Sequence, residues 1–403
     1  MTLEAQRRVR AVRVASLGAI VDRRKNGMIY VTSAQPLGEY PARVTDRLQF
    51  WASEAPERVF LAQRNRSGEW KTATYAETLT RVRTLASALL KHGLSSSRPL
   101  LILSGNGIEH ALLALAAMYV GIPFAPIAPA YSLAVRNFAA LGEVWQNLKP
   151  GMVFAAEGSL FAPALKAVMQ EEIKVIHHGS MPNGISSIAF AELESGATSP
   201  AVDDSNRRTG PDTIAKILFT SGSTGLPKGV ITTHRMLCAN QQMIRQVMPC
   251  LSDEPPVLCD WLPWNHTFGG SHNFGIALHN GGTLYIDAGR PTPELFGETI
   301  RNLREIAPTA YFNVPKGYEM LLGHLRADAE LRKTFFSRLN FLFFAAAGLS
   351  QHVWDALQDI AFETCGEEIL VVTGSVRRKL RRSRSRRESR VPPPVDRATG
   401  AGR

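Results

Sequence analysis

Residues 218–229 have the sequence LFTSGSTGLPKG, in which hydroxyl groups, glycines and one lysine follow an apolar run. An apolar run at 215–220 leads into it and predicts a strand, and the segment from His234 onward predicts a helix. Between the two, glycines let backbone amides turn inward, hydroxyl groups add donors, and Lys228 adds a positive charge. Converging N–H groups, hydroxyls and an ammonium are the groups that bind a polyphosphate. The stretch therefore predicts a phosphate-binding loop that follows a strand.

This loop differs from the common nucleotide-binding loop G-x-x-x-x-G-K-[ST], in which the lysine opens the helix. Here Lys228 lies between Pro227 and Gly229, so the pattern does not fit and a different kind of phosphate loop is expected. The residues predicted to hold the nucleotide are Thr220, Ser221, Gly222, Ser223, Thr224, Gly225 and Lys228.

Short apolar runs alternate with helix-length segments on both sides of the loop. Strands are predicted at 99–103, 123–127, 152–155, 173–177, 215–220, 257–261, 283–286, 309–313, 340–344 and 369–372. Helices are predicted at 107–119, 133–148 and 159–170, and a polar connector at 195–211. Continuous apolar strands between helices indicate parallel sheets covered on both faces. We therefore expect an α/β fold of two doubly wound subdomains, residues 1–205 and 206–374, with ligands at the carboxyl ends of the strands.

The net charge of +11 in this chain of 403 residues is unevenly distributed. Residues 375–403 contain eleven Lys and Arg against Glu388 and Asp396, an excess of nine, which leaves about +2 for the rest. Nucleic-acid binding by this basic tail stays open as an alternative. It is disfavoured, because the tail has no aromatic residues for base stacking and the body has no matching basic excess.

The four cysteines, Cys238, Cys250, Cys259 and Cys365, form no CxxC pair and have no histidine at metal-ligand spacing. This pattern predicts that the thiols are reduced and that the protein is cytoplasmic. No residue is predicted to ligate a metal. The apolar segment 111–130 could span a bilayer by length. Its glycine and three prolines predict a buried helix followed by a strand instead, so no membrane partner is expected.

Five motifs in order resemble the adenylate-forming superfamily, which contains acyl- and aryl-CoA synthetases, luciferases and adenylation domains of peptide synthetases. The loop TSGSTGLPKG at 220–229 is similar to the signature of that family. Weaker matches are TYAE at 74–77, AMYVGIP at 117–123, WNHTFGG at 264–270 and AAAG at 345–348. The finer texture, including LPWNHTFGG, YFNVPKGYEML and FFAAAGLS, is most similar to feruloyl-CoA synthetases.

The resemblance implies a reaction in two steps, with ATP, Mg²⁺ and CoA as cofactors and an aromatic carboxylate as substrate. The acid and ATP give an acyl adenylate and pyrophosphate, and the CoA thiol then displaces AMP. Lys228 and the loop would hold the β- and γ-phosphates, and His266 would lie at the carboxylate, which makes both catalytic candidates. Phe268, Gly269, Asn313 and Val314, together with His266, would line the acyl pocket, and Gly348 would lie against adenine.

The chain departs from the family after Gly374. The family continues T-G-Y-G-x-T-E, in which the tyrosine stacks on adenine and the glutamate helps to bind Mg²⁺, whereas this chain continues SVRRKLRRS. With suitable codons, one inserted base turns that stretch into Tyr-Gly-Ser-Thr-Glu-Thr-Ala-Pro-Phe, which restores the motif. We therefore expect residues 375–403 to be a disordered, frameshift-derived tail.

The same departure implies a chain without the small C-terminal domain of the family and its adenylation lysine. We expect such a chain to be an impaired or inactive ligase. A non-catalytic nucleotide-binding protein is the alternative.

Overall fold

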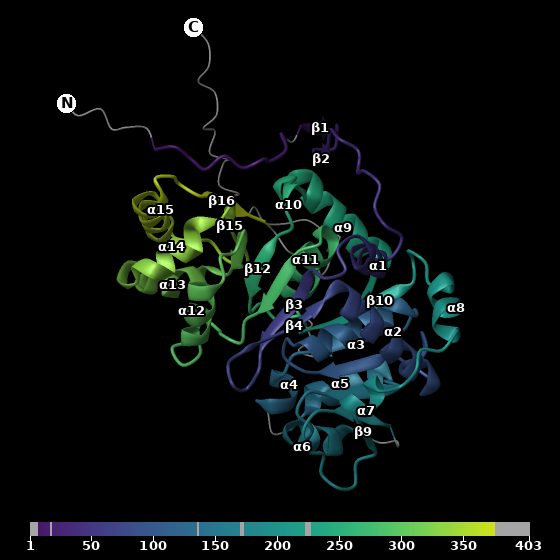
Figure 1. Cartoon of the computed structure of the whole chain (residues 1–403). Coiled ribbons are helices and arrows are strands. Elements are labelled where there is room, and N and C mark those ends of the chain that lie inside the picture. The colour runs from purple at the N-terminus through teal and green to yellow at the C-terminus, as the bar shows by residue number, and fades with distance from the viewer. Residues whose placement is uncertain (1–6, 17, 135–136, 170–172, 222–226, 375–403) are drawn as a thin grey trace, which may run out of the picture.

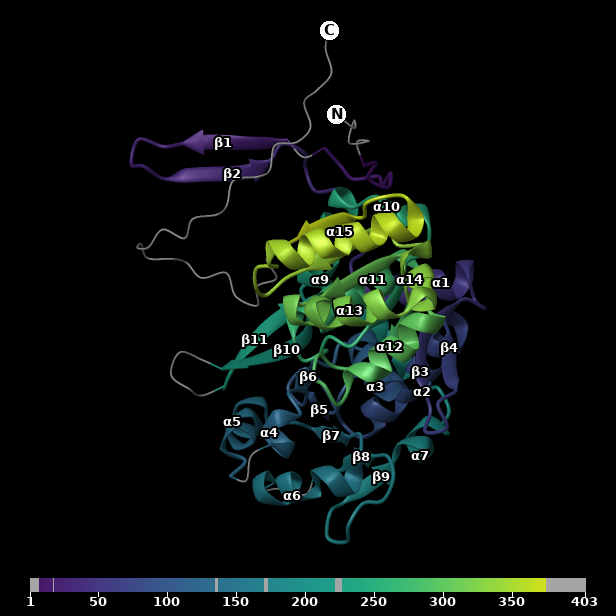
Figure 2. The same cartoon turned by 90° about the vertical axis from the view of Figure 1, so that its left-hand side faces the viewer.

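The computed structural model describes residues 7–16, 18–134, 137–169, 173–221 and 227–374. It confirms an α/β architecture in which helices pack against mostly parallel sheets (Figure 1). A two-stranded hairpin near the N-terminus, β1 (Ala19–Arg23) and β2 (Ile29–Ser33), stands clear of this body and is exposed along its whole length (Figure 2).

The largest sheet has seven strands in the order β11-β10-β6-β5-β7-β8-β9. Their bounds are β5 Leu100–Leu103, β6 Phe124–Ile127, β7 Met152–Ala155, β8 Val175–His177, β9 Ser187–Ala189, β10 Ile214–Ser221 and β11 Pro227–Thr233. Every residue of β5, β6 and β7 is buried, as parallel strands covered on both faces require. Only the pair β10–β11 in this sheet is antiparallel among the described strands.

Two smaller sheets complete the body, in the orders β12-β13-β3-β4 and β14-β15-β16. Their strands are β3 Val59–Arg64, β4 Trp70–Thr74, β12 Val257–Asp260, β13 Thr283–Ile286, β14 Ala310–Asn313, β15 Phe341–Phe344 and β16 Leu370–Thr373. The expected boundary near residue 205 does not coincide with a boundary between sheets. Strands β10 and β11 join the first sheet, and β3 and β4 from the N-terminal part pair with β13.

The helices fill the spaces around these sheets. Their bounds are α1 Val44–Glu54, α2 Tyr75–Lys91, α3 Ile108–Tyr119, α4 Ala130–Leu133, α5 Ala139–Leu148, α6 Gly158–Val168, α7 Phe190–Glu194, α8 Ala201–Arg208, α9 His234–Val247, α10 Cys250–Asp253, α11 Phe274–Asn280, α12 Phe296–Glu305, α13 Pro315–Ala327, α14 Ala329–Ser337 and α15 Gln351–Cys365. A π-helix, η1 (Phe268–Asn273), precedes α11 directly. One apolar core cluster includes residues of all three sheets of the body, among them Ile102, Leu284 and Phe312.

Two helix predictions need correction. The polar connector at 195–211 contains α8, which has acidic residues in its first turn and arginines in its last, as the helix dipole favours. Asp203 of this helix pairs with Arg83, and Asn206 donates a hydrogen bond of 2.9 Å to the carbonyl oxygen of Tyr119. The single helix predicted at 133–148 is instead α4 and α5, because Phe138, with φ of +44°, interrupts it.

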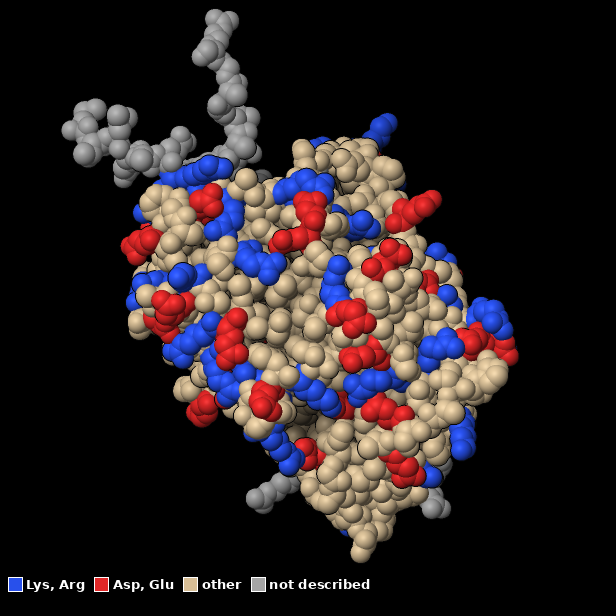
Figure 3. Space-filling view, in the orientation of Figure 1, with Lys and Arg blue, Asp and Glu red and all other residues tan. Residues whose placement is uncertain are grey.

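The surface carries both signs of charge side by side, and Figure 3 shows Lys and Arg interspersed with Asp and Glu over the face in view. The four cysteines are free, and Cys238, Cys250 and Cys259 are buried. In the part of the chain that the structure describes, no helix combines the length and apolarity needed to cross a bilayer.

Candidate functional site

The predicted phosphate loop joins the two strands of the hairpin β10–β11. The last register pairs before the loop are Thr220 with Lys228 and Ser221 with Pro227, and Lys228 is exposed. Figure 2 shows this hairpin extending away from the helices. Gly222, Ser223, Thr224 and Gly225 lie outside the described residues, so their role in phosphate binding stays a prediction. The strand β11 was not predicted, because the Pro-Lys-Gly sequence at its start resembles a turn.

The segment WNHTFGG leads into the π-helix η1, whose two glycines are fixed by close backbone contacts. A Cβ on Gly269 would lie 2.1 Å from the carbonyl oxygen of Leu262, and one on Gly270 would lie 2.1 Å from that of Trp264. Single turns of π-helix are frequent at functional sites. Gly269, which was predicted to bind substrate, is buried against this backbone.

His266 lies at the surface just before η1. Its ring nitrogen Nδ1 accepts a hydrogen bond of 3.2 Å from the backbone N–H of Phe268. The backbone N–H of His266 donates to the carbonyl oxygen of Pro263 at 3.0 Å. Because Nδ1 is the acceptor, a neutral His266 carries its proton on Nε2. In this tautomer Nε2 is a hydrogen-bond donor. A carboxylate oxygen can accept a hydrogen bond from such a donor.

A cavity of about 950 Å³ lies between helix α9 and the three-stranded sheet, and we call it the α9 cavity. Its lining includes Leu218, Val230, Ile231, Met236, Asn240, Met243, Thr267, Ser271, His272, Ile276, Phe312, Phe341, Phe343, Thr373 and Gly374. The residues Ile231, Met236 and Met243 are 53%, 56% and 51% exposed, so the cavity has an apolar wall open to solvent. A large exposed apolar surface of this kind marks a binding site.

The rings of His272, Phe312 and Phe343 line one wall of the α9 cavity. The ring of His272 contacts those of Phe268, Phe312 and Phe343, with centroids 5.6, 5.3 and 5.3 Å away. Phe268 is not itself among the lining residues; it packs behind His272 and Phe343. Its predicted part in the acyl pocket would thus be to support the wall from behind.

The other predicted pocket residues lie near the strand ends. The Asn313 side chain donates to the Tyr311 hydroxyl at 2.9 Å and accepts from the backbone N–H of Val314 at 2.8 Å. Asn313 is fully buried, and neither it nor Val314 lines the α9 cavity. Gly348 is exposed after β15, and no atom lies within 4 Å of a Cβ placed on it. The roles of these three residues stay predictions.

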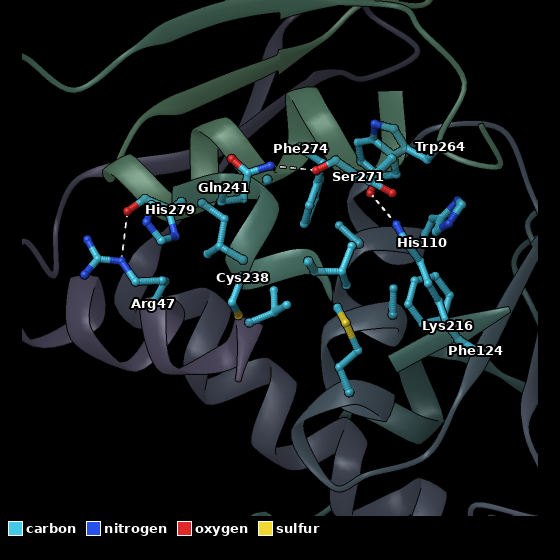
Figure 4. Close-up of a pocket in the computed structure, with 18 residues that line it drawn as sticks. Arg47, His110, Phe124, Lys216, Cys238, Gln241, Trp264, Ser271, Phe274 and His279 are labelled. Carbon is cyan, nitrogen blue, oxygen red and sulfur yellow. Dashed lines mark hydrogen bonds between the residues drawn. The ribbon is translucent and has the colours of Figure 1, made fainter. Parts of the chain in front are cut away.

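A second, smaller cavity of about 50 Å³ lies behind η1 (Figure 4). Figure 4 shows Lys216, His110 and His279 around it, and the ammonium of Lys216 donates a hydrogen bond of 2.7 Å to the carbonyl oxygen of Gly270. Arg47 and Gln241 also line it and donate to the carbonyl oxygens of His279 and Ser271. This cavity has room for a few water molecules.

Two buried polar side chains lie at the end of strand β12 and in the π-helix, Asp260 and Asn273, and the Asp260 Oδ2 and Asn273 Nδ2 atoms have no hydrogen-bond partner among the described residues. Burial raises the pKa of Asp260 to about 7, while the side chain of Asn273 and the backbone N–H of Leu262 favour the ionised carboxylate. Asn273 is fully buried and accepts a hydrogen bond from His272 at 2.8 Å between Oδ1 and Nδ1.

Sequence reasoning missed Lys216, Asp260 and His272. A lysine inside the apolar run AKILF was the available signal for the first of them, because an uncompensated ammonium is rarely buried. In the described residues, no group of three or more His, Cys, Asp or Glu side chains is arranged to hold a metal ion.

Two curated ligases are similar to this chain in sequence. A long-chain-fatty-acid–CoA ligase of Mus musculus is 25% identical over 316 residues, which are 75% of this chain and 46% of that protein. A long-chain-fatty-acid–AMP ligase of Mycobacterium tuberculosis is 26% identical over 216 residues, 51% of this chain and 34% of that protein. The chain thus spans less than half the length of these curated relatives.

Solved structures show the same fold. A benzoate CoA ligase from Burkholderia xenovorans LB400 superposes with a TM-score of 0.66 at 20% identity, covering 83% of this chain and 61% of that one. A luciferase-like enzyme from Zophobas morio gives 0.63 at 18% identity, covering 83% and 72%. The fold is therefore that of the N-terminal domain of adenylate-forming enzymes, as expected. The model of the AMP-binding enzyme family matches residues 48–373, and the chain belongs to that family.

Proposed function

We propose that this chain is an ATP-dependent acid–thiol ligase of the feruloyl-CoA synthetase type. In the first step, a carboxylate oxygen of the acid attacks the α-phosphorus of ATP. The bond to pyrophosphate breaks, and an acyl adenylate forms. In the second step, the thiol of CoA attacks the acyl carbonyl, loses its proton and releases AMP.

Residues at two places support the adenylation step. Thr220 and Lys228 lie opposite each other where the glycine- and hydroxyl-rich loop joins the hairpin. Preorganised N–H groups and an ammonium stabilise the negative charge that builds on the phosphates as pyrophosphate leaves. His266, with its proton on Nε2, would hold the carboxylate by a hydrogen bond and so fix its approach to the phosphate.

The observation that carries the proposal is the α9 cavity and its position. Its rim includes Thr373 and Gly374 at the carboxyl end of β16, where ligands bind in open α/β sheets. Its deep wall is built of phenylalanine rings and His272, which favours a flat aromatic acid through stacking and edge contacts. Met236 and Met243 add adaptable apolar surface on the opposite side.

Pyrophosphate exchange into ATP tests this function. We expect exchange that depends on ferulate and exceeds the exchange seen with hexadecanoate or benzoate. The substitution His266→Ala should reduce it at least tenfold, and His352→Ala, which removes an exposed histidine of α15, should not. Exchange with hexadecanoate alone would instead assign the chain to fatty acids.

We further propose that exchange is slow in this chain, because Ser375 and Lys379 stand where the family has tyrosine and glutamate. These residues lie outside the described part of the chain. Reading the gene across codons 374–376 tests the frameshift that would explain them. A clean reading in the present frame, with related genes encoding the same basic tail, would rule the frameshift out.

A further inference from the structure

The imidazole of His272 is held rigidly in the wall of the α9 cavity. It lies on η1 and contacts the rings of Phe268, Phe312 and Phe343, which leave it little freedom to turn. Among the described residues, the ring makes one hydrogen bond, from Nδ1 to Oδ1 of Asn273 at 2.8 Å. Its other nitrogen, Nε2, has no partner there.

The neighbours of His272 decide which nitrogen carries the proton. The side-chain oxygen Oδ1 of Asn273 faces Nδ1 of His272 at 2.8 Å, and its amide nitrogen has no hydrogen-bond partner among the described residues. Because Oδ1 can only accept, a neutral His272 must carry its proton on Nδ1. Burial lowers the pKa of His272 to about 4, so the ring is neutral at pH 7. Its Nε2 is therefore an acceptor with a free lone pair.

An acceptor in an apolar wall discriminates between ligands. If the ligand brings no donor, Nε2 loses its contact with water and gains nothing in return, whereas a hydroxyl of the ligand restores the hydrogen bond. A simple fatty acid or benzoate has no donor besides the carboxyl group that reacts. A phenolic acid carries one on its ring and also stacks on Phe312 and Phe343.

We propose that His272 determines specificity by accepting, at Nε2, a hydrogen bond from a hydroxyl group on the aromatic ring of the acid. This inference rests on the proposed function and names the residue that would recognise the ring hydroxyl of its acid. Asn273 is then a positioning residue, since it fixes the tautomer of His272. Thr267 is the rival polar group on the same wall, because its Oγ1 is buried and has no partner among the described residues.

Equilibrium binding of two acids that differ only in this hydroxyl tests the inference. The probes are 4-hydroxycinnamate and cinnamate, titrated by calorimetry into the full chain with a non-hydrolysable α,β-methylene analogue of ATP. We expect the native chain to bind the hydroxy acid about three- to tenfold more tightly. His272→Phe keeps an aromatic ring in the cluster but removes the acceptor, so the two affinities should become equal. Asn273→Leu removes the acceptor that holds the proton of His272 on Nδ1, so it should reduce the preference for the hydroxy acid.

The matched control is Thr267→Val, which removes the rival hydroxyl and should keep the preference. Two results in the variants would overturn the assignment: a preference for the hydroxy acid that survives in His272→Phe, or one that disappears in Thr267→Val alone. Equal affinities of the native chain for the two acids would overturn it as well. Thermal melting of each variant separates a lost contact from a lost fold, because both acids would weaken together in a damaged protein. Lack of pyrophosphate exchange with every acid would count against ligase activity in this chain, while a hydroxyl preference in binding would still support His272.

Discussion

The ammonium of Lys216 donates a hydrogen bond of 2.7 Å to the carbonyl oxygen of Gly270. Lys216 lies in β10, the strand that enters the phosphate loop, and is only 2% exposed. Gly270 lies in η1, the helix that carries His272. This charged contact therefore joins the two parts of the candidate site, the one that would hold ATP and the one that would hold the acid.

Replacing Lys216 with Met should destabilise the protein. The carbonyl group of Gly270 would remain behind η1 without its donor, and a hydrogen bond to a charged group is worth about 1.5–3 kcal/mol. We expect the free energy of unfolding in urea to fall by roughly 2 kcal/mol. Lys91→Met, at the exposed end of α2, is the control and should change it by less than about 0.5 kcal/mol. Equal stability of the native chain and K216M would contradict the role assigned to Lys216.

Gly270→Ala should displace the π-helix. The new Cβ would lie 2.1 Å from the backbone oxygen of Trp264, a contact that cannot relax by a side-chain rotation. We expect a loss of about 3 kcal/mol in stability and a loss of acid binding in calorimetry. Gly297→Ala in α12 is the matched control, since nothing lies within 4 Å of its Cβ. Gly297→Ala should stabilise the helix by about 0.5–1 kcal/mol. A similar loss of stability in both variants would mean that the contact at Trp264 is unimportant.

Most of the fold could be predicted from the sequence. The apolar runs that form β5, β6, β7 and β13 can be recognised from neighbouring residues alone. The structure places each of these strands within a residue of its predicted bounds. The pairing of the strands could not be read in this way. The partnership of β13 with β3, more than two hundred positions earlier in the chain, depends on long-range packing that no local pattern records.

The site was only partly predictable for a related reason. His266 and the loop at 220–229 belong to motifs, and motifs can be read from sequence alone. The proposed role of His272 depends on Asn273 beside it and on Phe312 and Phe343, which lie on two strands elsewhere in the sequence. A histidine in the sequence GGSHNF carries no sign of its tautomer or of the rings around it.

Lys228→Ala should weaken ATP binding with little effect on the fold. Lys228 is exposed at the open end of the hairpin, so its contribution to stability is small. Loss of one ammonium at a triphosphate should raise the dissociation constant of ATP about fivefold to thirtyfold, most strongly at low ionic strength. Calorimetry at two salt concentrations measures this, with Lys333→Ala on the exposed face of α14 as the control. An unchanged affinity in K228A would remove Lys228 from the phosphate site.

The buried carboxyl group of Asp260 should make stability depend on pH. Burial raises its pKa from 3.8 to about 7, so between these values the native state holds a proton that the unfolded chain has lost. The free energy of unfolding therefore falls as pH rises from 4 to 7, by at most about 4 kcal/mol from this group. Asp260→Asn keeps the acceptor oxygen for the N–H of Leu262 but cannot ionise, so it should lose this dependence.

The buried histidines have the opposite effect, which is why the variant must be compared with the native chain at each pH. Burial lowers the pKa of four of them to about 4, so their contribution to stability rises as pH rises through 4 to 6.5: His110, His234, His272 and His279. They are present in both proteins, so subtracting the two urea-unfolding profiles between pH 4 and 8 isolates Asp260. The stability of D260N relative to the native chain should increase steadily up to about pH 7 and then level off. A flat difference would show that Asp260 titrates in the folded protein as it does in the unfolded one.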